Sequence, residues 1–299
     1  MKPIERALLS LNGLSVGDSL GECFFVSTQT ALSMIEAKEL PESPWRYTDD
    51  TEMAISIVEV LHRCDGIDPD TLADLFASRY NPLRGYGSGA HRLLQSYREG
   101  KDWRIESRKL FGGSGSYGNG SAMRIAPLGA YFAENLNTVR DNAILSARPT
   151  HAHPEATAGA IAIAIGAAIA WRAGEGKVYE LSAKEYLEAV IEHVPKSKTG
   201  EGIIKAIELL DEKSSSAVAN ILGSGQRVSS QDTVPFVLWC ASKNLYNFVD
   251  AFWDTVRGLG DRDTTCAMAG GIVSLSDRLN GIPKEWLKAR EPLPLVFLL

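Results

Sequence analysis

The sequence predicts an all-α protein, a compact single domain of many helices that covers residues 1–299. Two observations support this prediction. Apolar residues recur at steps of three and four through most of the chain, which is the period of one buried helix face. Runs in which apolar and polar residues alternate, the pattern of a half-buried strand, are scarce. No low-complexity linker divides the chain, and no period typical of a solenoid is visible.

In the N-terminal part of the chain, the helical period predicts three helices. The spaced apolar residues are Ile4, Leu8, Leu11 and Leu14 in the first, Met53, Ile57, Val60 and Leu61 in the second, and Leu72, Leu75 and Phe76 in the third. The third helix is expected over residues 70–79. Asp70 is its predicted N-cap, because a carboxylate at that position accepts a free backbone N–H group of the first turn.

Three further helices are expected in the C-terminal part. Residues 156–171 carry no charge and consist mainly of alanine and glycine. The stretch is shorter than the ~20 strongly apolar residues that span a bilayer, so we expect a buried helix with closely packed neighbours. Residues 182–194 begin with Ser182 and Glu185, which fits a capping box. The last of the three covers residues 267–279.

Composition excludes several classes of function. The 31 basic and 37 acidic residues give a net charge of −6, which argues against a nucleic-acid binder. The four cysteines form no CxxC pair, so a zinc site or redox motif is not expected. The N-terminal residues show no apolar core of a signal peptide. A cytoplasmic location with free thiols is the simplest expectation.

Three segments hold acidic or polar residues beside glycines or predicted helix starts. They are residues 17–22 (GDSLGE), 47–52 (YTDDTE) and 258–265 (GLGDRDTT). In the second segment, one aspartate is explained as a helix cap, but adjacent carboxylates repel each other unless a cation lies between them. Capping and metal binding both remain open for this segment taken alone. The third segment repeats the pattern, and such oxygen ligands suit Mg²⁺ or Mn²⁺.

A glycine-rich run, residues 111–124, is another candidate. It lacks the GK[ST] of a P-loop, and no strand precedes it. The run is either a flexible turn or a backbone cradle that lets N–H groups approach a phosphate or ribose. His151 and His153 stand just before the alanine-rich helix, where either of them could serve as a helix cap.

Together these segments resemble the ADP-ribosylglycohydrolase family, whose members remove ADP-ribose from modified proteins. The resemblance runs from about Leu9 to about Trp286. It rests on seven motifs in family order: GDSLG (17–21), YTDDTEM (47–53), RGYGSG (84–89), GSYGNGSAMRIAPLG (115–129), THAHPEA (150–156), TVPFVLW (233–239) and GDRDTT (260–265).

The resemblance implies an all-α fold with a cleft that holds two divalent ions, Mg²⁺ or Mn²⁺. The implied metal ligands are Thr48, Asp49, Asp50, Asp261, Asp263 and Thr264. Asp50 or Asp263 would be the catalytic residue that orients the attacking water or takes its proton. The residues implied in substrate binding are Ser116, Tyr117, Gly118, Asn119, Gly120 and His151.

The expected function is metal-dependent removal of ADP-ribose from protein side chains. Arginine is the favoured linkage, because the motifs look closest to those of arginine-directed relatives. Serine-linked ADP-ribose, O-acetyl-ADP-ribose and other ADP-ribosyl conjugates remain alternatives. A non-catalytic binding or structural member of the family is less favoured, because both acidic clusters are intact. The expected partner is an ADP-ribosylated protein or a small conjugate, with no nucleic acid and no membrane.

Two positions depart from the family pattern. Many relatives carry an acidic residue a few positions beyond the GDxxG element, where this chain has Phe24 and Phe25. Glu22 lies one helical turn before Phe25, so it is a candidate to present a carboxylate to the same face. Arg262 stands between the two aspartates of the third segment, where small or polar residues are usual. Its side chain is expected either to point to solvent or to contact a substrate phosphate.

Overall fold

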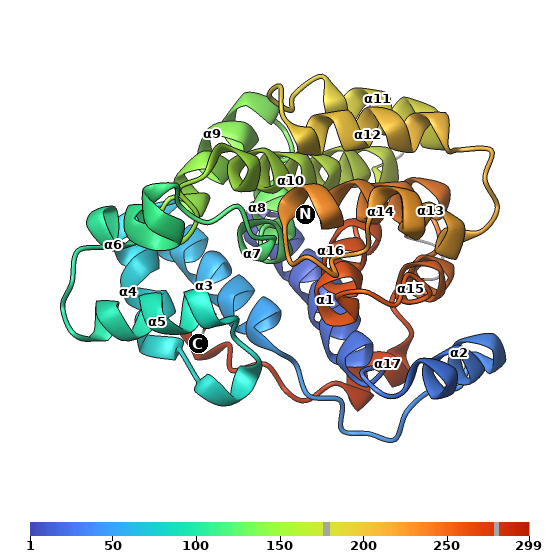
Figure 1. Cartoon of the computed structure of the whole chain (residues 1–299), viewed down its shortest axis with the longest axis horizontal. Coiled ribbons are helices and arrows are strands. Elements are labelled where there is room, and N and C mark those ends of the chain that lie inside the picture. The colour runs from blue at the N-terminus through green and yellow to red at the C-terminus, as the bar shows by residue number, and fades with distance from the viewer. Residues whose placement is uncertain (176–179, 278–280, 299) are drawn as a thin grey trace.

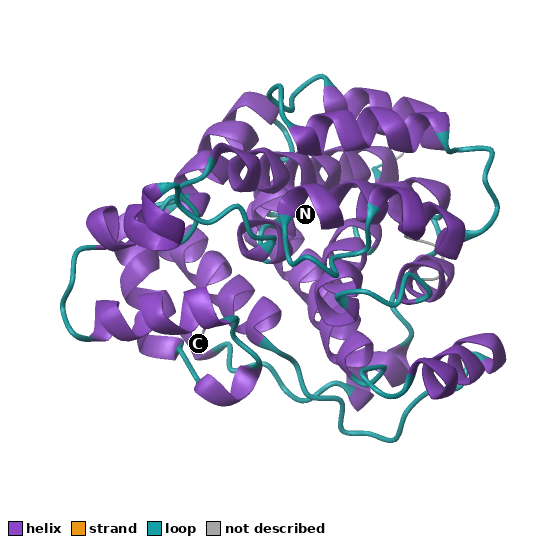
Figure 2. Cartoon of the chain, viewed as in Figure 1, coloured by secondary structure: helices purple, strands orange, loops and turns teal. Residues whose placement is uncertain are grey.

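The structure, a computed structural model, describes residues 1–175, 180–277 and 281–298. These residues form α-helices and short 3-10 turns, with no β-strand among them (Figure 2). The prediction of an all-α fold is therefore confirmed. In chain order the α-helices are α1 (Pro3–Glu22), α2 (Thr28–Ala37), α3 (Asp49–Cys64), α4 (Pro69–Arg79), α5 (Ser88–Arg98), α6 (Trp103–Lys109), α7 (Gly120–Met123), α8 (Ala126–Tyr131), α9 (Leu136–Ala147), α10 (Pro154–Gly174), α11 (Ala183–Ile191), α12 (Lys198–Glu208), α13 (Ser215–Leu222), α14 (Ser230–Lys243), α15 (Phe248–Val256), α16 (Arg262–Val273) and α17 (Lys284–Ala289).

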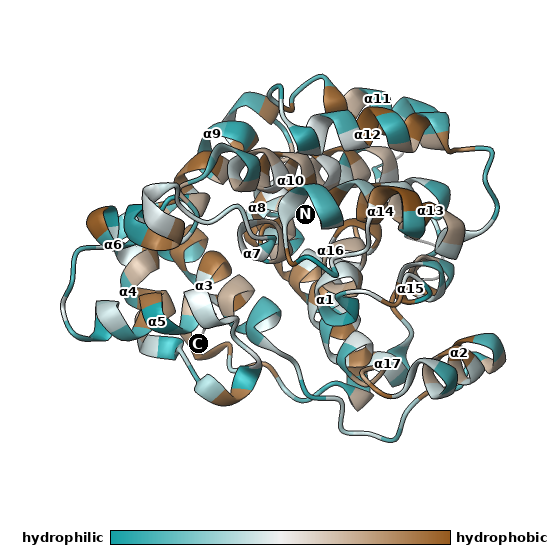
Figure 3. Cartoon of the chain, viewed as in Figure 1, coloured by the Kyte–Doolittle hydropathy of each residue, from teal (hydrophilic) through white to brown (hydrophobic). Residues whose placement is uncertain are grey.

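The alanine-rich helix α10 runs through the interior, where it contacts α8, α9, α11, α12 and α14 (Figure 1). Its length and composition alone would suit a membrane span, but 89% of its most apolar window is buried inside the structure. The prediction of a buried helix is confirmed. His153 is its N-cap, since Nδ1 accepts the backbone N–H of Glu155 at 3.1 Å. Outer helices such as α11 and α12 instead carry both hydrophilic and hydrophobic residues (Figure 3).

Helices α1 and α16 pack antiparallel at very close range. A Cβ placed on Gly13 would lie 2.3 Å from the carbonyl oxygen of Gly270, and one on Gly17 would lie 2.1 Å from that of Cys266. A Cβ on Gly21 would meet the carbonyl of Arg262 at 2.5 Å. Three glycines four residues apart thus line one face of α1 and let the two backbones touch. This contact fixes how the side chains of α1 lie relative to those of α16.

The predicted N-cap at Asp70 is wrong. Helix α4 begins one residue earlier, at Pro69, and Asp68 is its N-cap, accepting the N–H of Thr71 at 2.7 Å. Proline favours the first helical position, because it has no N–H to satisfy there. Asp70 instead accepts the indole N–H of Trp103 at 2.7 Å and forms an exposed ion pair with Arg104.

Two other predicted helices form with different ends. The capping box at Ser182 and Glu185 is confirmed, but α11 ends at Ile191 rather than at residue 194. The predicted helix over residues 267–279 is α16, which begins at Arg262 and ends at Val273. The predicted positions 278 and 279 lie outside the described residues. The earlier start matters, because it makes Asp261 the N-cap residue of α16.

Candidate active site

Carboxylates from three helices meet where α1, α3 and α16 come together. Asp18 lies in the last turns of α1, Asp50 in the first turn of α3, and Asp263 in the first turn of α16. One oxygen atom from each of these three side chains lies within 4.8 Å of the others. Asp49 and Asp261 also lie close enough for the charge of Asp261 to raise the pKa of Asp49. The fold therefore joins two acidic segments that are about two hundred residues apart in the sequence.

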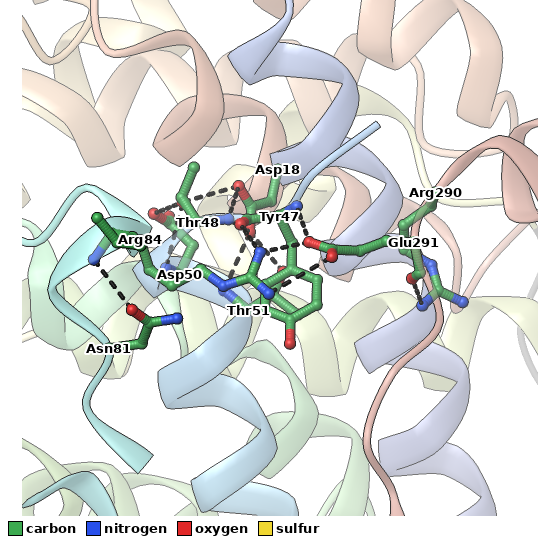
Figure 4. Close-up of polar contacts among 10 residues, drawn as sticks. Asp18, Tyr47, Thr48, Asp50, Thr51, Asn81, Arg84, Arg290 and Glu291 are labelled. Carbon is green, nitrogen blue, oxygen red and sulfur yellow. Dashed lines mark hydrogen bonds and ion pairs between the residues drawn. The ribbon is translucent and has the colours of Figure 1, made fainter. Parts of the chain in front are cut away.

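Asp18 connects α1 to the start of α3. Its buried carboxylate accepts the backbone N–H groups of Thr48 (3.0 Å) and Thr51 (3.1 Å) and the hydroxyl of Thr51 (Figure 4). The Thr48 hydroxyl lies 2.8 Å from Asp18 Oδ1 and 3.0 Å from Asp50 Oδ2, and Thr48 is the N-cap of α3. Burial raises the pKa of Asp18 to about 6, against the lowering effect of these hydrogen bonds. Asp18 thus holds the Thr48–Asp50 turn against α1.

One carboxylate oxygen of Asp50 has no hydrogen-bond partner among the described residues. Its Oδ2 lies near the hydroxyls of Thr48 and Thr264 (3.4 Å), but its Oδ1 is buried and has no hydrogen-bond partner. Burial, followed by the charges of Asp18 and Asp263, raises the pKa of Asp50 well above its usual range. An unpartnered buried acceptor is costly, so such an atom calls for a ligand.

The pKa values of Asp49 and Asp263 are raised as well. Burial and the charge of Asp18 raise the pKa of Asp49 to about 8, and burial with the charge of Asp261 raises that of Asp263 well above its usual range. Among the described residues, no lysine or arginine forms an ion pair with these aspartates. Hard oxygen donors packed without a counter-charge fit a divalent cation, which would restore the charged carboxylates.

Asp261 links this cluster to the glycine-rich segment. Its carboxylate accepts the side-chain N–H of Asn119 at 2.7 Å, and the same amide donates to Thr233 Oγ1 at 3.2 Å. The backbone N–H of Asp261 donates to the carbonyl of Ser224 at 2.9 Å. In this structure Asn119, a predicted substrate contact, therefore uses its amide to hold an aspartate in place.

The other predicted substrate contacts lie beside Asn119. Ser116 Oγ accepts the N–H of Gly118 at 3.2 Å, which tightens the turn. Tyr117 is 42% exposed, and its ring lies 6.1 Å from that of Phe111, which is 60% exposed. The His151 ring lies against Gly118 and Gly120, where added Cβ atoms would come within 3.3 Å and 2.9 Å of it. Backbone N–H groups, exposed aromatic rings and one imidazole thus share a wall next to Asp261.

Sequence reasoning missed Asp18 as a site residue. The GDSLG motif contains it, but the signal of its role is the set of glycines at spacing four, which brings α1 against α16. Glu22 lies one turn beyond Asp18. Much of the residue is exposed, but partial burial of its carboxylate, together with the charges of Asp18 and Asp261, raises its pKa. Its carboxylate thus lies in the negative field of the cluster.

Arg262 takes neither of its two expected positions. The guanidinium is buried and donates to the backbone carbonyls of Phe24 and Leu259, and it stacks over the ring of Phe25 at 5.1 Å. The arginine therefore fixes the chain beyond α1 instead of facing solvent or the cluster.

A C-terminal segment supports the residues that lead into α3. The backbone N–H of Trp45 donates to the carbonyl of Ala289 (2.7 Å), and the backbone N–H of Glu291 donates to the carbonyl of Trp45 (2.9 Å). The Glu291 carboxylate accepts the N–H of Tyr47 at 2.9 Å and forms an ion pair with Arg84 (Figure 4). Arg84 also donates to the carbonyl of Tyr47 at 2.8 Å and stacks on its ring. Tyr47 directly precedes Thr48, so these contacts fix the entry to the cluster.

Replacement of Glu291 by glutamine is expected to destabilise the fold by about 1.5 kcal/mol, because the ion pair with Arg84 is mostly buried and charge-assisted. Thermal denaturation measures the change. The exposed pair Lys184–Glu188 provides the matched control, and Glu188→Gln is expected to cost about 0.5 kcal/mol or less. Equal losses for the two variants would contradict a supporting role for Glu291.

The family model for ADP-ribosylglycohydrolase matches residues 1–294 of the chain. The chain belongs to the ADP-ribosylglycohydrolase family. The ADP-ribosylhydrolase ARH3 of Mus musculus is 28% identical over 97% of this chain and 88% of its own length, and that of Homo sapiens is 28% identical over 96% and 90%. An uncharacterized protein of Archaeoglobus fulgidus is 29% identical over 92% of this chain and 88% of its own.

A solved structure described as an ADP-ribosylglycohydrolase-related protein complex has the same fold. It aligns with a TM-score of 0.60 and 23% identity, and the alignment covers 97% of this chain and 93% of that one. Family membership identifies the chain as a glycosyl hydrolase that acts on ADP-ribose conjugates. The three-aspartate cluster is compatible with the divalent metal that such hydrolysis uses.

Proposed function

We propose that this hydrolase releases ADP-ribose from modified protein side chains, with arginine as the favoured linkage, and that it uses two divalent ions, Mg²⁺ or Mn²⁺. The observation that carries the proposal is the convergence of carboxylates from α1, α3 and α16, one of which, that of Asp50, has a buried Oδ1 with no hydrogen-bond partner. Thr48, Asp49 and Asp50 would hold the ions from one side, and Asp261, Asp263 and Thr264 from the other. Asp18 adds a carboxylate that sequence reasoning did not assign to the site.

The side chains have distinct roles in this reaction. When bound, divalent ions supply Lewis-acid stabilisation to the oxygen atoms around the reacting sugar carbon. Asp50 or Asp263 orients the attacking water and takes its proton. The C1″–nitrogen bond breaks with its electron pair going to nitrogen, the water oxygen bonds to C1″, and the proton taken by the aspartate passes to the departing guanidine, which leaves as guanidinium. Ser116 to Gly120 and His151 bind the ADP-ribose moiety, which aligns C1″ with that water.

Charge supports the arginine linkage. Five aspartates, with Glu22 beyond them, give the site more negative charge than two divalent ions would cancel. The arginine side chain is a guanidinium cation once it has taken up the proton, so a residual negative field attracts and stabilises this product. A serine hydroxyl or an acetate gains nothing comparable from such a field.

Release of ADP-ribose from synthetic conjugates tests the proposal. Arginine-linked and serine-linked ADP-ribosyl peptides and O-acetyl-ADP-ribose are incubated with the protein in Mg²⁺, in Mn²⁺ and in EDTA. We expect the fastest release from the arginine peptide, in either metal, and none in EDTA. Faster release from the serine peptide would overturn the linkage. No release from any conjugate in either metal would overturn the proposed function.

A further inference from the structure

His151 lies behind the glycine-rich segment with one edge of its ring toward that segment. The side chain is only 8% exposed. A Cβ on Gly118 would lie 3.3 Å from Nε2, so the missing side chain leaves room at this nitrogen. Within the described part of the chain, no group forms a hydrogen bond with Nε2. The nitrogen is therefore available to a ligand, and the location of its proton decides whether it donates or accepts.

The opposite nitrogen, Nδ1, lies 2.7 Å from the hydroxyl oxygen of Thr150. That oxygen also accepts an N–H of Arg124 at 2.8 Å. Arginine only donates hydrogen bonds, so one lone pair of the threonine oxygen is committed to Arg124. The hydroxyl proton of Thr150 is then free to point at Nδ1. In that arrangement Nδ1 is an acceptor, and the proton of the neutral ring is on Nε2.

Arg124 is well placed to impose this arrangement. It is fully buried, donates to the carbonyl of Ser146 at 3.0 Å, and stacks over the ring of Phe76 at 4.5 Å. Its guanidinium keeps a positive charge behind Thr150, and a second positive charge on the adjacent imidazole would be repelled. Burial and the charge of Arg124 lower the pKa of His151 to about 3. The ring is thus neutral in ordinary buffers.

We propose that Arg124 and Thr150 form a hydrogen-bonded relay that fixes His151 as the neutral tautomer with its proton on Nε2. His151 is then a permanent hydrogen-bond donor at the Gly118–Gly120 wall, and it binds an oxygen acceptor of the ligand. It exchanges no proton during the reaction. Arg124 and Thr150 are positioning residues, because they act through His151. This inference rests on the proposed function only for the identity of the ligand, ADP-ribose.

The tautomer is measured directly by long-range ¹H–¹⁵N correlation spectra of the ¹⁵N-labelled, metal-free and ligand-free protein. We expect an unprotonated Nδ1 and a protonated Nε2 for His151, unchanged between pH 5 and pH 8. Thr150→Val, which removes the hydroxyl, is expected to shift both nitrogens toward a mixture of tautomers. Thr150→Ser keeps the hydroxyl and is expected to restore the wild-type pattern.

His153 provides an internal control. Its Nδ1 accepts the backbone N–H of Glu155, so its signals are expected to be the same in both variants. A protonated Nδ1 on His151 in the wild type, or titration of His151 between pH 5 and pH 8, would overturn the relay. An unchanged tautomer in Thr150→Val would overturn the role of Thr150. The wild-type spectrum and Thr150→Ser decide the matter if Thr150→Val does not fold.

Binding of ADP-ribose adds a functional readout. Thr150→Val is expected to weaken ADP-ribose binding about tenfold by calorimetry, because a mixture of tautomers presents an acceptor to the ligand oxygen for part of the time. Thr150→Ser is expected to bind within about twofold of the wild type. Loss of affinity in both variants alike would assign Thr150 a packing role and reject the relay. A protein that passes the spectroscopic test but releases no ADP-ribose would keep the relay and reject the proposed function.

Discussion

Replacement of Asp263 by asparagine is expected to lower kcat/KM for release of ADP-ribose by at least about 100-fold. Residues that only support a metal ligand cost 10–100-fold when they are removed, so loss of Asp263 in its proposed role as a direct ligand is expected to exceed that range. Asparagine has nearly the shape of aspartate, but it lacks the negative charge and cannot take a proton from water. Initial rates in saturating Mn²⁺ measure the loss, and Mn²⁺ binding followed by electron paramagnetic resonance reports the affinity.

The same substitution is expected to leave the fold intact. Asp263 lies beside Asp18 and Asp50 in a cluster whose charges repel one another, so removing one charge is expected to raise the melting temperature of the metal-free protein. Asp141→Asn, on the exposed face of α9, is the matched control, for which neither rate nor stability is expected to change. Full metal-dependent turnover by Asp263→Asn would refute the proposed role of this residue.

Local signals in the sequence were enough to predict the helices and the two acidic segments. Helix periodicity and a capping box at Ser182 depend on residues within a few positions of one another, so no knowledge of the fold is needed to read them. The ends of the helices were predicted less accurately, because local signals alone often fit two neighbouring residues. Both Asp68 and Asp70 are suitable caps by residue type, and only the position of Pro69 favours the first of them.

The positions of Asp18 and Arg262 could not be predicted, because both depend on hydrogen-bond partners that are distant in the sequence. Asp18 is a site residue because Thr48 and Thr51, about thirty positions away, surround its carboxylate. Arg262 is buried because two backbone carbonyls, one of them from Phe24, accept its hydrogen bonds. Residues next to Arg262 in the sequence give no sign of these contacts, and the only local signal for Asp18 is the spacing of four between the glycines of α1. Both depend on how α1 packs against α16.

That packing is expected to make Gly17→Ala strongly destabilising, by roughly 3 kcal/mol or more. The new methyl carbon would lie 2.1 Å from the carbonyl oxygen of Cys266, and a backbone atom cannot rotate away as a flexible side chain can. Overpacking a tight contact costs typically 1–3 kcal/mol, and here the helix axes themselves must separate. For a chain of this size, we expect the melting temperature to fall by about 6 °C or more.

Separation of α1 from α16 also has a consequence for the site, since Asp18 follows Gly17 directly and Asp263 lies at the start of α16. We expect Gly17→Ala to weaken Mn²⁺ binding even at temperatures where the variant is fully folded. Gly66→Ala is the matched control, because its methyl group would meet Oδ1 of Asn142 at 3.6 Å and the carbonyl oxygen of Cys64 at 3.9 Å, both ordinary van der Waals distances. A Gly17→Ala protein with wild-type stability and wild-type Mn²⁺ affinity would show that the close helix contact does not position the carboxylates. Lower stability with unchanged Mn²⁺ affinity would show that Gly17 matters for the stability of the fold but not for metal binding. Asp18 would then be positioned by Thr48 and Thr51 alone.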